Sequence, residues 1–196
     1  MSEVSKHRDK FIPYCVGCGL DIGFGGDPVV PWAITFDLPK PYSHVGDKPQ
    51  HISGDARDLY MFKDNSLDFL FSSHCLEDFE NTHSVLLEWL RVVKFGGYLC
   101  LLFPDEKVYR AKTRVRNLEH KHEDFGMDFV MQILENINKV KMLTKEYSLT
   151  VVKQEECFEG DDYNCILVIQ KEGAEVKQGL EPMFKTHYLG HFPRVD

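Results

Sequence analysis

The sequence predicts an α/β protein with a Rossmann-like open sheet, mostly parallel, that has helices on both faces and a C-terminal antiparallel hairpin. Strand and helix signals alternate along the chain, which is typical of parallel strands joined by crossover connections. A glycine-rich turn follows the first apolar run, and an acidic residue stands in or just after each of the first three runs. Two strand-like runs near the C-terminus are joined by the short acidic turn at 159–162, which favours an antiparallel pair.

Five apolar runs are the predicted parallel strands, at residues 19–23, 33–37, 50–53, 66–72 and 98–103. The last of them is apolar at nearly every position, as expected of a strand that is buried on both faces. Residues 82–94 carry apolar side chains at helical spacing, and Gly96 and Gly97 are expected to end this helix. A second helix is predicted over 127–137, and the closing hairpin over 146–157 and 163–170.

The turn after the first strand reads Gly23-Phe24-Gly25-Gly26-Asp27-Pro28. A dinucleotide-binding turn needs a third glycine at a fixed place and a full helix whose N-terminus holds the pyrophosphate. Here six residues, two of them proline, separate Gly26 from Ala33, which leaves no room for such a helix. Asp37 follows Gly23 by 14 residues, against roughly 20 in the dinucleotide motif. The turn therefore indicates a ligand with ribose and adenine but no pyrophosphate, such as S-adenosylmethionine.

Length and charge indicate a single acidic domain. The 196 residues are enough for one substantial core, so we expect one domain over 1–196, with a core of about 15–171, an N-terminal lead of 1–14 and a tail of 172–196. With 31 acidic and 23 basic residues the net charge is −8, which argues against nucleic acid as a partner. No apolar run approaches the length of a membrane span, and the first residues do not resemble a signal peptide. We expect a cytoplasmic protein without a membrane partner, either a monomer or a homodimer.

Two of the six cysteines form a Cys15-x-x-Cys18 pair. Such a pair can bind zinc or act in redox chemistry, but no second cysteine or histidine pair stands at a matching distance. Two reduced thiols beside a strand explain the spacing more simply. The sequence therefore predicts no metal site.

Several segments together resemble a known family: GLDIGFGGDP, AITFD, GDARDL, FKDNSLDFLFSSHCLEDFEN and LLEWLRVVKFGGYL. In this order they closely resemble the class I S-adenosylmethionine-dependent methyltransferases of the small type 11 kind, over roughly residues 15–140. Two departures stand out. The family usually has Lys-Pro-Gly-Gly where this chain has Lys94-Phe95-Gly96-Gly97, and the helix after the first strand is shortened.

The resemblance implies S-adenosylmethionine as cofactor, S-adenosylhomocysteine as product, and a set of binding residues at the strand ends. These are Asp21 for the methionine ammonium, Gly23, Phe24 and Gly25 beside the ligand, Asp37 and Leu38 at the ribose, Asp55 and Ala56 at the adenine, and Ser73 and His74 under the methyl group. Some of these residues are equally compatible with a structural role, because glycines favour any turn and Asp55 can cap a helical turn over 56–60. Asp37 is harder to account for in that way, since a carboxylate that ends an apolar strand needs a partner.

Methyl transfer needs mainly alignment of nucleophile, methyl and sulfur, and an oxygen nucleophile also needs a base. The Asn/Asp-Pro-Pro-Tyr motif of many amide and amine methyltransferases is absent after the fourth strand, so we expect a small-molecule acceptor and O-methylation. The candidate catalytic residues are His74 and the pair His120 and His122. That pair also allows metal binding or purely structural hydrogen bonds, and the alternatives stay open.

Residues 107–122 reverse the charge of the chain, with six basic side chains against one acidic side chain. This segment suggests an anionic acceptor such as a carboxylate, a phosphate or a sugar nucleotide. A solvated loop whose charge aids solubility explains the same pattern.

Two other functional classes remain open from the sequence. A catalytically inactive protein that binds S-adenosylmethionine and regulates a partner is compatible with the departures at Phe95 and in the shortened helix. A nicotinamide-dependent oxidoreductase is disfavoured, because the third glycine is missing and Tyr109 and Lys112 stand one residue too close for the Tyr-x-x-x-Lys pair. The aromatic tail could close over the site, pack on the sheet or meet a second subunit; its members are Phe184, His187, Tyr188, His191 and Phe192.

Overall fold

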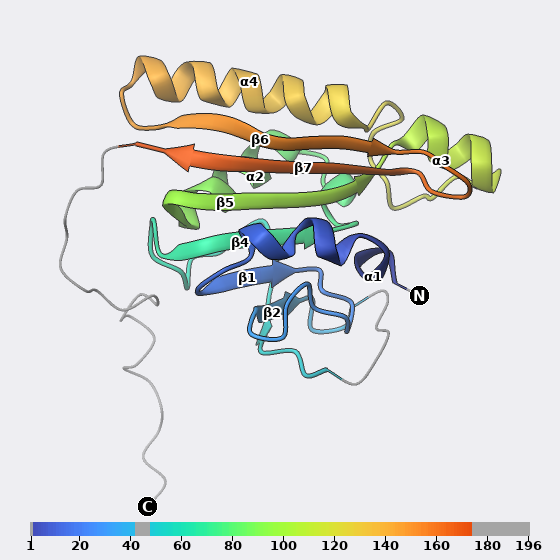
Figure 1. The fold of residues 1–196 in the computed structure, drawn as a ribbon, viewed down its shortest axis with the longest axis horizontal. Helices are drawn as coiled ribbons and strands as arrows, with labels where there is room; N and C mark the ends of the chain where they lie inside the picture. Colours follow the sequence, from blue (N-terminus) through green and yellow to red (C-terminus); the bar gives the residue numbers. More distant parts are fainter. Residues whose placement is uncertain (1, 42–47, 174–196) are drawn as a thin grey trace, which may run out of the picture.

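The computed structural model describes residues 2–41 and 48–173, and the aromatic tail residues named above lie outside this part of the chain. Seven strands form one sheet in the order β3-β2-β1-β4-β5-β7-β6 (Figure 1). The strands are β1 Gly19–Ile22, β2 Ile34–Asp37, β3 Ile52–Ser53, β4 Leu67–Ser73, β5 Val93–Pro104, β6 Ser148–Cys157 and β7 Asn164–Glu172. Strands β1 to β5 pair in parallel, and β7 is antiparallel to both β5 and β6. The predicted fold class is confirmed.

In the described residues, four helices and three 3₁₀ turns accompany the sheet. They are α1 Glu3–His7, α2 Thr82–Val92, α3 Glu106–Thr113 and α4 Met127–Leu143, with η1 Arg8–Lys10, η2 Ile12–Tyr14 and η3 Leu76–Asp78. Helix α2 begins after Asn81, whose side chain accepts the backbone N–H of Ser84 at 3.1 Å. None of the described helices is long and apolar enough to cross a bilayer.

The expectation that Gly96 and Gly97 end helix α2 is wrong. The helix ends at Val92, and β5 starts at the next residue. Both glycines lie inside β5, where its register with β4 shifts between Leu67 and Phe69. Gly96 has a φ of +81°, and a Cβ on Gly97 would lie 2.7 Å from the carbonyl oxygen of Asp68. The pair therefore permits an irregularity in the strand, which is another place where glycine is favoured.

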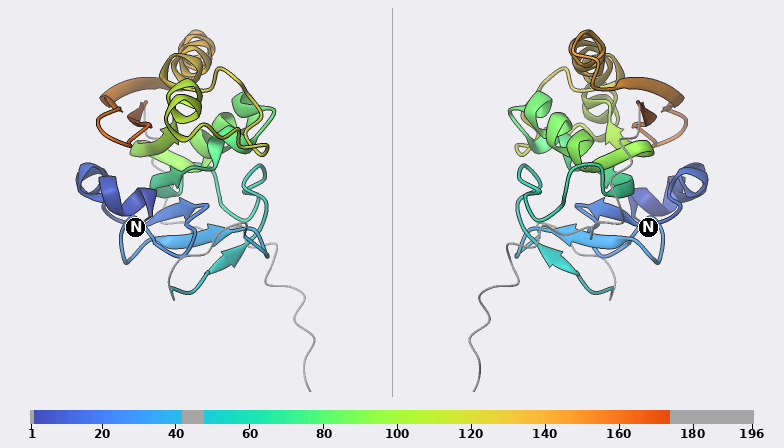
Figure 2. Two further views of the ribbon diagram at one scale, coloured as in Figure 1. Left: turned by 90° about the vertical axis from the view of Figure 1, so that its right-hand side faces the viewer. Right: turned by 90° about the vertical axis from the view of Figure 1, so that its left-hand side faces the viewer.

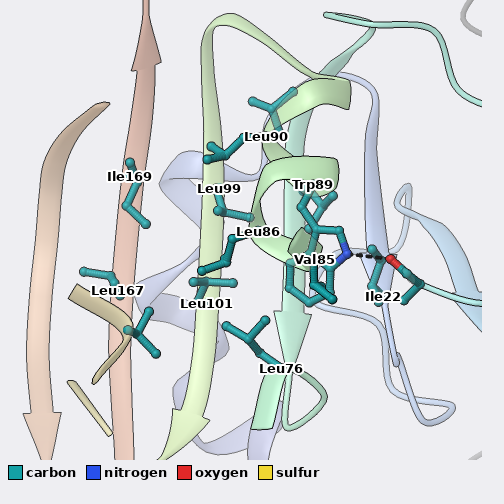
Figure 3. Packing of buried hydrophobic residues seen from close by; sticks show 14 of the residues in the cluster. Ile22, Leu76, Val85, Leu86, Trp89, Leu90, Leu99, Leu101, Leu167 and Ile169 are labelled. Atoms are coloured by element: carbon teal, nitrogen blue, oxygen red, sulfur yellow. Dashed lines mark hydrogen bonds between the residues drawn. The ribbon is translucent and has the colours of Figure 1, made fainter. Parts of the chain in front are cut away.

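Side chains alternate between two cores on opposite faces of the sheet. On one face, Trp89 and its neighbours on α2 pack against Leu99 and Leu101 of β5 and Leu167 and Ile169 of β7 (Figure 3). On the other face, the intervening residues of β4, β5 and β7 pack against the N-terminal segment, including Val4 and Phe11. Figures 1 and 2 show α1 and α2 on opposite sides of the sheet. Strands β4, β5 and β7 are thus buried on both faces.

The crossovers around β2 and β3 differ from those of an ordinary doubly wound sheet. Within the described residues, 23–33 and 48–66 contain turns but no helix, so the predicted alternative of a helical turn over 56–60 is not formed. The N-terminal segment of α1, η1 and η2 covers the face that a first crossover helix would otherwise cover. This substitution brings the beginning of the chain next to the glycine turn.

Candidate functional site

A cavity of about 570 Å³ opens at the carboxyl ends of the parallel strands. This is the edge of an open α/β sheet where ligands bind, and the volume suits a small cofactor. Nine of the ten predicted cofactor-binding residues line it: Gly23, Phe24, Gly25, Asp37, Leu38, Asp55, Ala56, Ser73 and His74. The tenth, Asp21, is not part of the lining.

The glycine turn forms one wall of the cavity. Gly23 and Gly25 have φ values of +66° and +55°, a backbone region that side chains disfavour. A Cβ on Gly23 would also lie 3.0 Å from the Cβ of Cys75, which follows β4. The two loops can approach this closely because the glycine has no side chain.

Asp37 ends β2 with its carboxylate pointing at the glycine turn. Its Oδ1 accepts the backbone N–H of Leu38 at 2.8 Å, and its Oδ2 accepts that of Gly25 at 3.2 Å. Each oxygen has a second lone pair, so the carboxylate can still accept two hydrogen bonds from a ligand. The glycine turn therefore supplies part of the hydrogen bonding that was expected for Asp37 at the end of β2.

Asp55, after β3, is held by its neighbour Arg57. The guanidinium Nε lies 2.9 Å from Oδ1 and Nη2 lies 2.5 Å from Oδ2, and these hydrogen bonds lower the pKa of the Asp55 carboxyl. The pair is largely exposed, so it adds little to stability. A ligand amino group at Asp55 has to share the carboxylate with Arg57.

Asp21 is completely buried below the cavity. Its Oδ2 accepts the backbone N–H of Val29 at 2.6 Å, which fixes the turn between β1 and β2. Its Oδ1 is buried and has no hydrogen-bond partner among the described residues. Burial, with smaller contributions from the charges of Asp27 and Asp37, raises the pKa of Asp21 to about 8. These contacts describe a residue that shapes the turn, and its place at the methionine ammonium stays a prediction.

The raised pKa of Asp21 predicts a pH-dependent stability that Asp21→Asn removes. The folded-state pKa of about 8 lies above the ordinary value of 3.8. The protonated carboxyl therefore contributes stability that is complete below the lower value and is lost as the pH rises toward the higher one. The measured quantity is the melting temperature of Asp21→Asn minus that of the unmodified protein. We expect this difference to increase by at least about 4 °C between pH 4.5 and 8. A difference that stays constant over this range would contradict the assignment; thermal unfolding followed by circular dichroism measures it.

His74 follows β4 and faces the cavity with a backbone φ of +49°. Asn164 donates its amide N–H groups to Glu3 and Asp162 at 2.8 and 2.6 Å, so its oxygen is left to accept the Nε2–H of His74 at 2.6 Å. The other ring nitrogen, Nδ1, lies 3.4 Å from the Glu77 carboxylate. Burial opposes the charged ring, but Glu77 and Asn164 outweigh it and raise the pKa of His74. Both ring nitrogens of His74 are thus occupied by protein groups, and in this arrangement neither is free to accept a proton from an acceptor.

His120 and His122, predicted as a pair, point to different partners. The Nδ1 of His120 lies 2.5 Å from Glu106 and its Nε2 lies 3.8 Å from Glu77, so this ring joins the polar group behind His74. His122 instead lies 3.1 Å from the carbonyl oxygen of Phe79 and 3.3 Å from Thr82. Neither ring lines the cavity. The contacts of His122 are structural hydrogen bonds, one of the alternatives that the sequence left open. His120 is instead buried among the acids Glu77 and Glu106.

A family model described as a methyltransferase domain matches residues 37–101, which hold the ends of β2, β3 and β4 that line the cavity. Over these residues the chain is similar to a methyltransferase domain. Its fold is that of the class I S-adenosylmethionine-dependent methyltransferases, and S-adenosylmethionine is the cofactor of this class. Comparison of the sequence with curated proteins gave no match.

Three solved structures have a fold similar to that of this chain. A SAM-dependent methyltransferase from Archaeoglobus fulgidus is 17% identical with a TM-score of 0.63, covering 86% of this chain and 92% of that chain. A Haloferax volcanii complex of the Trm112 methyltransferase activator with a methyltransferase is 17% identical with a TM-score of 0.60, covering 86% and 89%. The plantazolicin methyltransferase BpumL, in complex with SAH, is 12% identical with a TM-score of 0.56, covering 86% and 82%.

The sequence did not predict two parts of the cavity lining. Ser2, Glu3 and Val4 of the N-terminal segment line it, although this segment carries no periodic pattern and no motif. Asp78, in the turn η3, also lines it, and burial together with the charge of Glu77 raises its pKa to about 6. The available signal for Asp78 was the pair of adjacent acids in the turn that follows the fourth strand, because this turn lies at the ligand edge of the sheet.

Most basic side chains of residues 107–122 contact other groups of the protein. Lys112 donates to three backbone carbonyl oxygens of the β6–β7 turn, and Arg110 pairs with the buried Glu106. Arg116 lies 3.1 Å from Glu123 at the surface. None of the basic residues of 107–122 lines the main cavity, whereas Glu3, Asp37, Asp55 and Asp78 do. The charged lining is therefore mainly acidic.

One group of potential metal ligands occurs in the described part of the methyltransferase. Donor atoms of His7, Cys157 and Asp162 lie within 4.8 Å of one another. His7 already pairs with Asp162 at 2.9 Å, and the ammonium group of Lys10 lies 3.3 Å from the Cys157 sulfur. The ammonium group of Lys10 would repel a metal ion in that position. The contacts among these side chains explain why they lie close together without a metal ion.

Proposed function

We propose that this protein transfers a methyl group from S-adenosylmethionine to a hydroxyl group of a small molecule. The observation that carries the proposal is the cavity, in which the glycine turn, Asp37, Asp55 and the residues after β4 converge at one edge of the sheet. The cavity fits this cofactor in size, and the two unused lone pairs of Asp37 match a ribose diol. When bound, the cofactor supplies a methyl group already activated on a sulfonium.

The remaining predicted residues take roles along the same wall. We propose that Leu38 and Ala56 bracket the adenine, that Asp55 accepts its amino group, and that Gly23 and Gly25 let the ligand approach the backbone. Phe24, Ser73 and His74 then lie beside the sulfur end. The chain's own residues bind, orient and exclude water, which is the main demand of methyl transfer.

We propose Asp78 as the group that accepts the proton of the acceptor hydroxyl. It lines the cavity, while both nitrogens of His74 are occupied. A carboxyl whose pKa lies near 6 is ionised at neutral pH and still basic enough to take a proton. The acidic lining also favours a neutral or cationic acceptor over the anionic one that the basic segment suggested, since carboxylates would repel an anion.

Asp78→Asn is expected to lower kcat/KM by about 10² to 10³-fold, the range for loss of a general base. Because Asp78 must be ionised to act, the rate of the unmodified enzyme is expected to fall below about pH 6, and the variant is expected to lose this dependence. Glu77, His120, Glu119 and Lys121 are the charged groups that influence this carboxyl. Asp124→Asn, at an exposed position, is the matched control. An unchanged pH profile in Asp78→Asn would remove Asp78 from this role.

The proposed function is tested first by titration calorimetry with S-adenosylhomocysteine and, separately, with NAD. Binding of the first and not the second is expected. A panel of hydroxyl, amine and carboxylate acceptors is then assayed for S-adenosylhomocysteine release, and turnover with a hydroxyl acceptor supports the proposal. Binding of NAD alone overturns it, and cofactor binding without turnover on any acceptor favours a regulatory protein.

A further inference from the structure

We propose that Glu3, on helix α1, binds the ammonium group of the cofactor's methionine moiety. The inference deepens the proposed function and rests on it. It gives a role to the N-terminal helix, which lies beside the glycine turn where the crossover between Gly26 and Ala33 is too short for a helix.

The position of α1 is the first argument. Ser2, Glu3 and Val4 line the same cavity as Gly23, Phe24 and His74. Asp55 and Ala56 follow β3, at one edge of the sheet, whereas Glu3 contacts Asn164 at the start of β7, beyond β4 and β5. A ligand whose adenine lies at Asp55 and whose ribose lies at Asp37 therefore directs its other end toward β4 and the N-terminal helix.

The second argument is that α1 is fixed to the glycine turn. Ser2 and Arg8, at the two ends of the helix, both bond to the Asp27 carboxylate, and the guanidinium of Arg8 also donates to the carbonyl oxygen of Pro28 at 3.3 Å. Val4 is buried in the core on this face of the sheet. Glu3 is thus held beside the turn by contacts on both sides of it, which is the preorganisation that a binding residue needs.

The third argument is the charge of the Glu3 carboxylate and its neighbours. Its side chain is 23% exposed and receives hydrogen bonds from Lys6 at 2.7 Å and from Asn164 at 2.8 Å. Burial opposes ionisation, but these two donors prevail and lower the pKa of Glu3, so the group is an anion at neutral pH. His74, whose pKa is raised, lies on the same wall, and an amino-acid end carries both an ammonium and a carboxylate. Asp21 does not line the cavity, whereas Glu3 does.

The test compares S-adenosylhomocysteine with its deaminated analogue, which lacks only the amino group, on the full-length protein and on Glu3→Gln. Titration calorimetry is expected to show that Glu3→Gln binds S-adenosylhomocysteine about 10- to 100-fold more weakly, the range for a hydrogen bond between charged groups. The same substitution is expected to change the affinity for the deaminated analogue by less than about twofold, because the interaction is then absent from both arms of the cycle.

Two further variants make the result specific. Glu3→Asp keeps the charge and is expected to recover part of the affinity, and Glu135→Gln, at an exposed position of α4, is expected to match the unmodified protein. Equal weakening toward both ligands, or none toward either, overturns the inference while leaving the proposed function intact. If the unmodified protein does not bind S-adenosylhomocysteine at all, both the inference and the proposed function fail.

Discussion

Trp89→Ala is expected to destabilise the protein by about 3–5 kcal/mol, the range for deleting a large buried aromatic side chain. Trp89 is completely buried on α2, and its ring meets that of Phe79 edge to face at 6.3 Å. Its indole N–H also donates to the carbonyl oxygen of Ala56 at 2.8 Å (Figure 3). The substitution therefore leaves both a cavity and an unsatisfied buried carbonyl, and urea unfolding measures the loss of free energy.

Trp89→Phe separates the two contributions to this loss. The phenyl ring fills much of the space but cannot donate a hydrogen bond, so an intermediate loss of about 1–3 kcal/mol is expected. Trp32→Ala, at a position that is 54% exposed, is the matched control and is expected to cost less than about 1 kcal/mol. Similar losses for Trp89→Ala and Trp32→Ala would show that the helix does not depend on this ring. Since Ala56 lines the cavity, Trp89→Phe is also expected to weaken cofactor binding.

Asp37→Asn is expected to weaken S-adenosylhomocysteine binding by about 100-fold, corresponding to two charge-assisted hydrogen bonds. The carboxylate accepts backbone N–H groups from Leu38 and Gly25, and its remaining lone pairs are the proposed ribose acceptors. An amide has only one acceptor oxygen, so it cannot serve the turn and both hydroxyl groups together. Titration calorimetry gives the affinity, and thermal unfolding confirms that the variant is folded.

The matched control for Asp37→Asn is Asp161→Asn, in the exposed turn between β6 and β7. It makes the same chemical change far along the chain and is expected to leave affinity within about twofold of the unmodified protein. Unchanged binding in a folded Asp37→Asn would place the ribose elsewhere in the cavity.

The strands were predictable because their side chains report directly on burial. Strands β1, β2 and β4 and the second half of β5 are short apolar runs, and the acidic turn before Asn164 marks the hairpin, so the order of these strands follows from pattern alone. The glycine turn and Asp37 were predictable for a related reason. Positive φ values and a carboxylate at the end of an apolar strand each leave a trace in the residue type.

The parts that were missed depend on contacts between distant segments. Helix α1 has only five residues and no amphipathic repeat, so nothing in its composition indicates that Glu3 reaches the cavity. His120 and His122 look equivalent in sequence, and only the packing of their loop against Glu106 and Phe79 separates them. The charge of residues 107–122 does not locate a site by itself, because a count of basic residues does not reveal the carbonyl oxygens and the acid that Lys112 and Arg110 contact.

The hydrogen bond between Glu3 and Asn164 has a consequence for the order in which the protein matures. It joins residues 161 positions apart, so this wall of the cavity forms only after β7 has been added to the sheet. Long-range pairings of this kind form late, because the chain must close a large loop first. A growing chain on the ribosome already contains the glycine turn and Asp37 but cannot yet assemble the complete pocket. Ligand binding at the complete pocket is therefore expected only after β7 has been synthesised.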